Sequence, residues 1–384
     1  MSFDANRADL CVGVIGTGAM GRGIVQVTAA GGMHVLMMDT RPGAADEARD
    51  FVAKMLARAA EKGAISKADA DAATARIRVA QSLAEFKDCH MVVEAIVENL
   101  DAKRALFGEL EGIVGPECIL ATNTSSMSVT TIAAKLKTPQ RFAGLHFFNP
   151  VPLMKLVEVI DGLLTVNWVS EALMVIGKRM TREPVRLTDA PGFLVNQVGR
   201  GFTLEASHLV YEGIASFVDV DRVMRDVGGF RMGPFELMEL TGLDVTQPAS
   251  VLIYNQFFQE PRYRPNLIMQ SRYEAGVLGR KSKKGFYDYD AEMKPIIVPE
   301  APAPAARPTS VWISKAEPQG HEVLAALLAK LGATVESGDK PSAKALILVA
   351  PVANDATSCA VEEGLDPKRT VAVDTLFPVV KRRT

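Results

Sequence analysis

Cysteine is scarce in this chain. The 384 residues include four cysteines, Cys11, Cys89, Cys118 and Cys359, which are scattered and form no C-x-x-C pair. Zinc sites and disulfide frameworks need clustered or regularly spaced cysteines. Neither is therefore expected, no metal site is predicted, and the pattern fits small buried side chains in a reducing compartment.

Long apolar runs and a dominant charge are also missing. No run reaches the ~20 apolar residues of a membrane span, and the N-terminal segment MSFDANRADL carries acids and no apolar core. We therefore expect no membrane partner and no signal peptide, and a cytoplasmic location. The formal net charge is −2, so no basic surface indicates a nucleic-acid partner. A nucleotide ligand needs only a local positive site and stays compatible with this charge.

The N-terminal segment has the pattern of a βαβ unit. Residues 11–15 (CVGVI) form an apolar run, a glycine-rich turn follows, and a helical pattern begins at Arg22. Gly31 and Gly32 are typical of a helix end, and residues 34–38 (HVLMM) form a second apolar run. Runs that are apolar throughout indicate parallel strands buried on both faces.

The glycine-rich turn predicts a dinucleotide site. Gly16 permits a tight turn, Gly18 lets the backbone approach a pyrophosphate, and Gly21 lets the helix pack close to the strand. The helix N-terminus then offers N–H groups to the phosphates. Asp39 lies 18 residues beyond Gly21, at the expected place of an acid that binds the ribose hydroxyls. A 2′-phosphate would meet this carboxylate, so NAD is favoured over NADP, although Arg41 nearby weakens that preference.

The rest of the chain suggests three folded regions. Strand patterns at 77–80, 90–96, 118–122, 142–147, 155–160 and 184–188 alternate with helical patterns such as 44–62, 101–113 and 167–181. This alternation predicts an α/β class with an N-terminal Rossmann-like doubly wound sheet. An all-α domain and a small C-terminal α/β module are expected to follow. The predicted ranges are 1–188 for the NAD-binding domain, 189–290 for the helical substrate and dimerisation domain, 291–308 for a Pro/Ala-rich linker, and 309–384 for the module of unknown role.

A histidine and a glutamate on successive strands suggest the chemistry. His146 ends one strand pattern, and Glu158 lies twelve residues later inside an apolar one. A buried carboxylate needs a partner, so if the two strands are neighbours, His146 is the candidate. Such a pair suits alcohol oxidation, in which imidazole accepts the hydroxyl proton. A structurally satisfied core histidine is the alternative on spacing alone.

Several motifs in order resemble the 3-hydroxyacyl-CoA dehydrogenase family. They are the glycine loop Gly16–Gly21, Val92-Val93-Glu94-Ala95 through Glu98, Asn123-Thr124-Ser125-Ser126, His146-Phe147-Phe148-Asn149-Pro150, Pro191-Gly192-Phe193-Leu194-Val195-Asn196, Gly233-Pro234-Phe235-Glu236 and Gly285-Phe286-Tyr287. The resemblance covers about residues 10–289. It implies NAD-dependent oxidation of (S)-3-hydroxyacyl-CoA to 3-oxoacyl-CoA, as in β-oxidation of fatty acids.

The resemblance also assigns roles to individual residues. His146 corresponds to the general base and Glu158 to its orienting partner, while Ser125 and Asn196 correspond to residues that hold the substrate. Cofactor contacts are implied for Gly16, Gly18, Ala19, Met20, Gly21, Asp39, Glu98, Lys103 and Asn123. Lys54 and Arg58 correspond to a basic pair that meets the CoA phosphates; the family pattern has lysine where Arg58 stands.

The resemblance implies a homodimer formed through the helical domain. Two other functions stay open: a dehydrogenase of a free hydroxy acid or sugar acid, and a non-catalytic NAD-binding structural protein. The region beyond residue 290 resembles longer bacterial members linked to 3-hydroxyadipyl-CoA, which carry a second helical domain that this sequence does not reach. The absence of that domain is compatible with a shortened relative or a fragment. The last residues, Lys381-Arg382-Arg383-Thr384, are compatible with a basic tail or a truncation.

Overall fold

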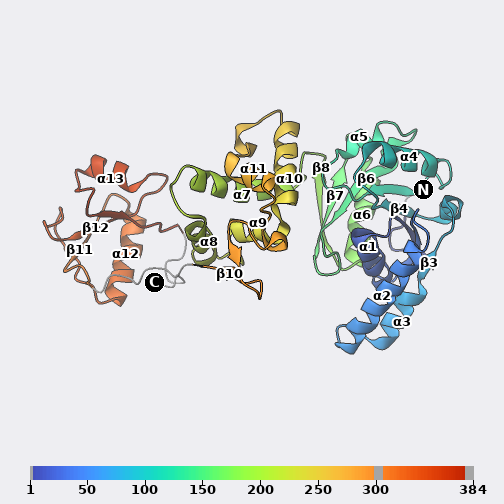
Figure 1. The fold of residues 1–384 in the computed structure, drawn as a ribbon, viewed down its shortest axis with the longest axis horizontal. Coiled ribbons are helices and arrows are strands. Elements are labelled where there is room, and N and C mark those ends of the chain that lie inside the picture. Colours follow the sequence, from blue (N-terminus) through green and yellow to red (C-terminus); the bar gives the residue numbers. More distant parts are fainter. Residues whose placement is uncertain (1–2, 298–305, 377–384) are drawn as a thin grey trace. The chain divides into compact units, whose positions relative to one another are not determined.

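The computed structural model describes residues 3–297 and 306–376 (Figure 1). The chain divides into two compact units, one of residues 1–201 and 249–264 and the other of residues 202–248 and 265–384. Each unit is described by itself below. Among the described residues, no helix is long and apolar enough to cross a membrane.

The first unit is built on an eight-stranded sheet in the order β3-β2-β1-β4-β5-β6-β7-β8. The strands are β1 (Cys11–Ile15), β2 (His34–Met38), β3 (Ile77–Val79), β4 (Met91–Glu94), β5 (Ile119–Thr122), β6 (Phe142–Phe147), β7 (Leu156–Asp161) and β8 (Glu183–Thr188). The helices are α1 (Ala19–Ala30), α2 (Ala44–Glu61), α3 (Lys67–Ala75), α4 (Leu100–Glu111), α5 (Val129–Ala133) and α6 (Asn167–Arg179), with 3₁₀ turns η1 (Leu83–Asp88), η2 (Pro139–Arg141) and η3 (Pro261–Tyr263). The structure confirms the predicted Rossmann-like α/β sheet with helices on both faces.

Two hydrophobic clusters hold the helices to the sheet. One cluster contains Ile24 of α1, Val52 of α2 and Leu173 of α6 beneath one face. The other contains Phe107 of α4 and Ile132 of α5 beneath the opposite face. All five side chains are fully buried, and strands covered on both sides have little room for polar residues. The all-apolar strand patterns follow from this two-sided burial.

One strand pair departs from the parallel order. β6 and β7 pair antiparallel, with His146 opposite Glu158, whereas the other neighbouring strands of this sheet pair parallel. Only residues 148–155 connect β6 to β7, and a parallel return needs a crossover of a dozen or more residues. The short connection therefore reverses the chain and places the histidine and the glutamate side by side.

The helical segment is shared between the two units. The elements are α7 (Val195–Tyr211), α8 (Phe217–Asp226), α9 (Pro234–Thr241), α10 (Leu243–Gln256) and α11 (Leu267–Glu274), followed by η4 (Arg280–Ser282), β9 (Asp288–Tyr289) and β10 (Pro295–Ile296). No strand occurs between residues 192 and 271, all of which the structure describes, so the predicted helical character is confirmed. Residues 295 and 296 pair with β9, so the first part of the predicted linker is a small hairpin; residues 298–305 lie outside the described part.

A buried carboxylate organises the second unit. Asp221 accepts hydrogen bonds from the backbone N–H of Phe235 (2.8 Å) and Glu236 (3.0 Å) and from the hydroxyl of Tyr287 (2.7 Å). Burial raises the pKa of Asp221 to about 6, although these hydrogen bonds oppose the rise. The two family motifs around residues 235 and 287 are therefore joined through one acid that neither motif contains.

The small C-terminal module is a parallel α/β unit. Its strands are β11 (Val311–Ile313), β12 (Leu346–Val349) and β13 (Thr370–Ala372), and its helices are α12 (Pro318–Lys330) and α13 (Ala356–Glu363). These elements confirm the expected α/β character of the module. Residues 377–384, which include Lys381, Arg382 and Arg383, lie outside the described part.

Helix α1 corrects one predicted boundary. It begins at Ala19, three residues before the Arg22 at which the helical pattern becomes visible. The first turn follows the glycine loop directly, and it shows no clear apolar periodicity because Ala19 is exposed and Gly21 has no side chain. Helix α3 begins with a side-chain cap, in which the Ser66 hydroxyl accepts from the backbone N–H of Asp69 at 3.0 Å. The domain boundaries given above stay predictions.

Candidate active site

The glycine loop leaves no room for side chains at two of its positions. Gly16 has φ of +90°, and a Cβ there would lie 2.6 Å from the carbonyl oxygen of Ala95. A Cβ on Gly21 would lie 1.8 Å from the carbonyl oxygen of Gly16. At Gly18 nothing lies within 4 Å of such a Cβ. The loop therefore contacts other backbone atoms closely at Gly16 and Gly21. It is open at Gly18, where the close approach of a pyrophosphate is predicted.

The N-terminus of α1 presents its backbone to this open side. The helix has no side-chain cap and no acid in its first turn. The first N–H groups of a helix lack intrahelical partners, and the dipole there favours an anion. Ala19 lines one adjoining pocket and Met20 another. The residues present thus fit the pyrophosphate of a dinucleotide.

Asp39 is held at the end of β2 by the same loop. Its carboxylate accepts from the backbone N–H (2.8 Å) and the hydroxyl (2.9 Å) of Thr17, and from the backbone N–H of Arg41 (3.0 Å). Burial opposes ionisation, but these hydrogen bonds outweigh it and lower the pKa of Asp39. The Arg41 guanidinium is 3.5 Å away and largely exposed. An ionised acid therefore stands where a ribose is expected, and the position of Arg41 leaves its side chain in solvent.

His146 and Glu158 form a buried pair. The Nδ1 atom of His146 lies 2.6 Å from Oε2 of Glu158, and the two side chains are 6% and 0% exposed. The imidazole is packed edge-on against Phe148, with ring centroids 4.6 Å apart, and beside Phe193 at 5.7 Å. Since Nδ1 is engaged, Nε2 is the nitrogen left to act on a ligand. The two strands are neighbours, and the two side chains are in contact, as expected under that condition.

Glu158 has two further partners that the sequence pattern did not indicate. Its Oε1 accepts from the backbone N–H of Leu194 (3.0 Å) and Val195 (2.8 Å), at the start of α7. A carboxylate at a helix N-terminus is stabilised by these donors and by the helix dipole. Backbone N–H groups exist at every non-proline residue, so no residue-type signal could have revealed them.

One pocket of about 330 Å³ brings seven of the fifteen predicted site residues together. It is lined by Met20, Ala95, Ile96, Glu98, Lys103, Asn123, Ser125, His146, Phe147, Phe148, Asn149 and Asn196. Asn123 is fixed there because its side-chain oxygen accepts from the backbone N–H of Phe147 at 2.9 Å. The pocket holds a base, a hydroxyl and several amides beside the glycine loop, which is the equipment for oxidising an alcohol next to a dinucleotide.

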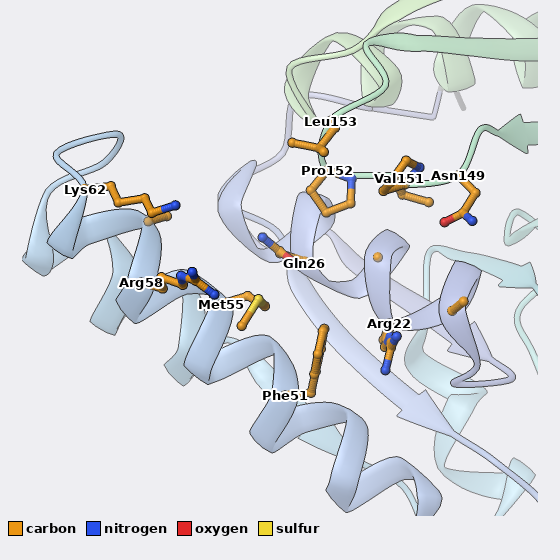
Figure 2. Close-up of a pocket in the computed structure, with 14 residues that line it drawn as sticks. Arg22, Gln26, Phe51, Met55, Arg58, Lys62, Asn149, Val151, Pro152 and Leu153 are labelled. Atoms are coloured by element: carbon orange, nitrogen blue, oxygen red, sulfur yellow. The ribbon is translucent and has the colours of Figure 1, made fainter. Parts of the chain in front are cut away.

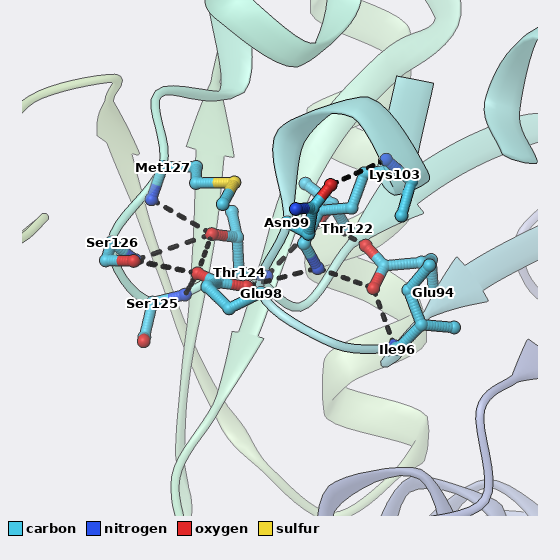
Figure 3. A network of polar contacts seen from close by, with 11 residues as sticks. Glu94, Ile96, Glu98, Asn99, Lys103, Thr122, Thr124, Ser125, Ser126 and Met127 are labelled. Atoms are coloured by element: carbon cyan, nitrogen blue, oxygen red, sulfur yellow. Dashed lines mark hydrogen bonds and ion pairs between the residues drawn. The ribbon is translucent and has the colours of Figure 1, made fainter. Parts of the chain in front are cut away.

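A polar network fixes the loop that carries Ser125 (Figure 3). Glu98 accepts from the hydroxyl of Thr124, and its Oε1 accepts from the backbone N–H of Ser125 (3.2 Å) and the hydroxyl of Ser126 (2.9 Å). Burial opposes ionisation of Glu98, but the hydroxyls of Thr124 and Ser126 and the ammonium group of Lys103 lower its pKa. Ser125, which lines the pocket, is thus held by a backbone that Glu98 anchors.

A second pocket, of about 520 Å³, lies between α1, α2 and the loop after β6 (Figure 2). Arg22, Arg58 and Lys62 line it, as do Phe51 and Leu153. The Arg22 guanidinium stacks over the Phe51 ring at 4.0 Å. Of the predicted basic pair, Arg58 lines this pocket and Lys54 does not. Lys62 follows Arg58 by one helical turn, and this i, i+4 spacing was the overlooked sequence signal.

Two family models cover most of the chain. Residues 11–190 match "3-hydroxyacyl-CoA dehydrogenase, NAD binding domain". Residues 192–289 match "3-hydroxyacyl-CoA dehydrogenase, C-terminal domain". The chain belongs to the 3-hydroxyacyl-CoA dehydrogenase family. As a member of this family it is an NAD-dependent dehydrogenase, and NAD is its cofactor.

Individual members of the 3-hydroxyacyl-CoA dehydrogenase family are similar over long stretches. A 3-hydroxyadipyl-CoA dehydrogenase of Escherichia coli is 37% identical over 354 residues, which is 89% of this chain and 74% of the relative. A probable 3-hydroxybutyryl-CoA dehydrogenase of Bacillus subtilis is 40% identical over 277 residues, 72% of this chain and 96% of the relative. The crystal structure of (S)-3-hydroxybutyryl-CoA dehydrogenase from Ralstonia eutropha matches with a TM-score of 0.70 and 38% identity, covering 73% of this chain and 99% of that one.

Proposed function

We propose that this chain oxidises (S)-3-hydroxyacyl-CoA to 3-oxoacyl-CoA, with His146 as general base and Glu158 as its orienting partner. The observation that carries the proposal is the 2.6 Å contact between His146 Nδ1 and Glu158 Oε2 at the wall of the pocket beside the glycine loop. NAD, when bound, supplies the hydride acceptor. The glycine loop and Asp39 would hold its adenosine half, and Glu98, Lys103 and Asn123 its nicotinamide half.

The protein residues account for the proton. With the Nδ1 proton donated to Glu158, Nε2 carries the lone pair that accepts the proton of the 3-hydroxyl group. Glu158 then stabilises the imidazolium, and the two N–H groups at the start of α7 keep its carboxylate in place. Ser125 and Asn196 line the same pocket, and we assign the Ser125 hydroxyl to the 3-oxygen and the Asn196 amide to the thioester end of the substrate.

The reaction and its stereochemistry are tested by NADH formation. We expect NADH from the (S) but not the (R) enantiomer of 3-hydroxybutanoyl-CoA, with long-chain 3-hydroxyacyl-CoA and 3-hydroxyadipyl-CoA assayed beside it to define the acyl specificity. Free 3-hydroxybutyrate and a sugar acid are the controls. Faster turnover of a free acid than of every CoA thioester would contradict the proposal and favour the alternative dehydrogenase.

The second pocket supplies a test of CoA recognition. We propose that Arg58 and Lys62, assisted by Lys54, meet the phosphates of CoA, because cations recognise phosphate, and Arg58 of α2 and Lys62 directly after it line the same pocket. Removing both Arg58 and Lys62 (R58A/K62A) is expected to raise KM for 3-hydroxybutanoyl-CoA by ~10–100-fold, the worth of one or two hydrogen bonds to charged groups. Turnover at saturation should be retained.

A truncated substrate separates phosphate binding from damage to the fold. The N-acetylcysteamine thioester of 3-hydroxybutyrate lacks the nucleotide, so the double variant should process it as the wild type does. Arg49→Ala is the matched control on the same helix, since Arg49 does not line the pocket and pairs with Asp46 and Asp50; its KM should stay close to that of the wild type. Equal losses with both thioesters would contradict the assignment of this pocket to CoA.

We also propose an oligomeric state and a cellular location. A homodimer through the helical segment is supported by large apolar side chains that are exposed on it, namely Tyr211, Ile214, Val223, Phe230, Leu240 and Val245. We further propose a cytoplasmic location, a role in fatty-acid β-oxidation, and no nucleic-acid or membrane partner. The proposed domains are 1–188 and 189–290, followed by a linker at 291–308 and the module at 309–384.

A further inference from the structure

Three charged side chains form a row that begins at the wall of the active-site pocket and ends behind it. Lys103 is 1% exposed, and its ammonium group lies 2.5 Å from Oε1 of Glu94 and 3.2 Å from Oε2 of Glu98 (Figure 3). Glu94 itself is 0% exposed. Lys103 and Glu98 line the pocket, whereas Glu94 lies behind them. We call Glu94, Lys103 and Glu98 the charge triad.

Glu94 is anchored from three parts of the fold. Besides Lys103 of α4, its carboxylate accepts from the backbone N–H of Ile96 (2.7 Å) after β4 and from the hydroxyl of Thr122 (2.7 Å) on β5. A buried ion pair is a poor source of stability, because apolar side chains of similar volume often serve a fold as well or better. The packing of the sheet therefore does not explain why a carboxylate stands at this position.

The charge triad has an excess of one negative charge. Two carboxylates face one ammonium group, and among the described residues that line the pocket, Lys103 is the only lysine or arginine. The nicotinamide ring is a cation in NAD⁺ and neutral in NADH. A fixed negative charge near the ring stabilises the first form and is nearly indifferent to the second. Glu94 and Lys103 are buried and Glu98 is 37% exposed, so solvent and salt screen this interaction only in part.

We propose that the charge triad makes the site bind NAD⁺ more tightly than NADH, and that Glu94 is the positioning residue that supplies the excess charge. Glu94 acts through Lys103, which its carboxylate neutralises, so that the charge of Glu98 is left uncompensated at the pocket wall. The inference rests on the assignment of Glu98, Lys103 and Asn123 to the nicotinamide half of the cofactor. Preferential release of NADH suits a site that works in the direction of alcohol oxidation.

Glu94→Gln tests this inference in the absence of substrate. The substitution keeps the size of the side chain and removes one negative charge. Dissociation constants for NAD⁺ and NADH are measured separately by calorimetry. The ratio Kd(NADH)/Kd(NAD⁺) is expected to fall on the order of tenfold, the effect of one charge across roughly 10 Å at an effective dielectric constant near 20. A purely structural role would weaken both ligands equally and leave the ratio unchanged.

Two further variants separate an effect of charge from an effect on the structure around Glu94. Thr122→Val removes a hydrogen bond to Glu94 without changing charge, so its ratio should stay close to that of the wild type. Glu98→Gln makes the same change of charge at a side chain that is 37% exposed, and it should lower the ratio even if E94Q does not fold. ADP-ribose, which lacks nicotinamide, should bind all variants alike.

The contrary results are distinct. An unchanged ratio in E94Q or E98Q, or an equal shift in T122V, would overturn the role of the charge triad. These measurements need no turnover, so they stand apart from the proposed function. A chain that failed to oxidise any 3-hydroxyacyl-CoA could still show or lack the charge effect.

Discussion

Replacing His146 by Gln is expected to cut turnover of 3-hydroxybutanoyl-CoA by ~10²–10⁴-fold, the usual contribution of a general base. Gln has no group that accepts a proton at neutral pH. Its amide still fills much of the space between Phe148 and Phe193, and Glu158 keeps the N–H groups of Leu194 and Val195 as partners. Binding of NAD, measured by calorimetry, should stay near the wild-type value, because the glycine loop is untouched.

His90 offers a matched control for this substitution. It is half-buried just before β4, and its Nδ1 accepts from the backbone N–H of Cys11 at 3.0 Å. That end of the sheet is opposite to the carboxyl ends of the strands, where ligands bind in such folds. His90→Gln should therefore leave turnover close to wild type. If H146Q also kept turnover within a few-fold of wild type, the assignment of the base would be wrong.

The sequence predicted the parts of the site that depend on residue type and local order. Glycines at positions 16 and 21 have no space for a Cβ, and the sequence carries this requirement as a fixed pattern. The same holds for apolar strands covered on both faces. The His146–Glu158 pair was predicted only on the condition that the strands are neighbours. The short connection of residues 148–155 meets that condition by reversing the chain.

The parts that the sequence did not reveal depend on tertiary contact. Donation from the backbone of Leu194 and Val195 leaves no trace in side-chain identity. Glu94 reads as one acid within a family motif, and its place opposite Lys103 becomes visible only when α4 packs over β4 and β5. The spacing of Arg58 and Lys62 is visible in the sequence, but the pocket that both side chains line is formed only when α2 packs beside α1. Each omission concerns an orientation rather than a residue type.

Replacing Glu158 by Gln is expected to reduce turnover by as much as ~10⁴-fold, although the change is nearly isosteric. In hydrolase triads, replacing the orienting acid by its amide holds the imidazole in the wrong tautomer and costs that much. The geometry here imposes the same outcome. The carbonyl oxygen of the introduced amide must take the position that Oε1 of Glu158 holds, because two backbone N–H groups point at it. The NH₂ group of that amide then faces His146 Nδ1.

A donor opposite Nδ1 forces the proton of the neutral imidazole onto Nε2. Because Nε2 faces the substrate and already carries a proton, it cannot accept the hydroxyl proton. The loss should therefore appear in kcat, while KM for the acyl-CoA changes little. The double variant H146Q/E158Q decides whether the two residues act as one unit. Its turnover should be no lower than that of H146Q alone, since an orienting residue has nothing left to orient. Multiplied losses would instead show that Glu158 works independently of His146, and would refute the paired mechanism.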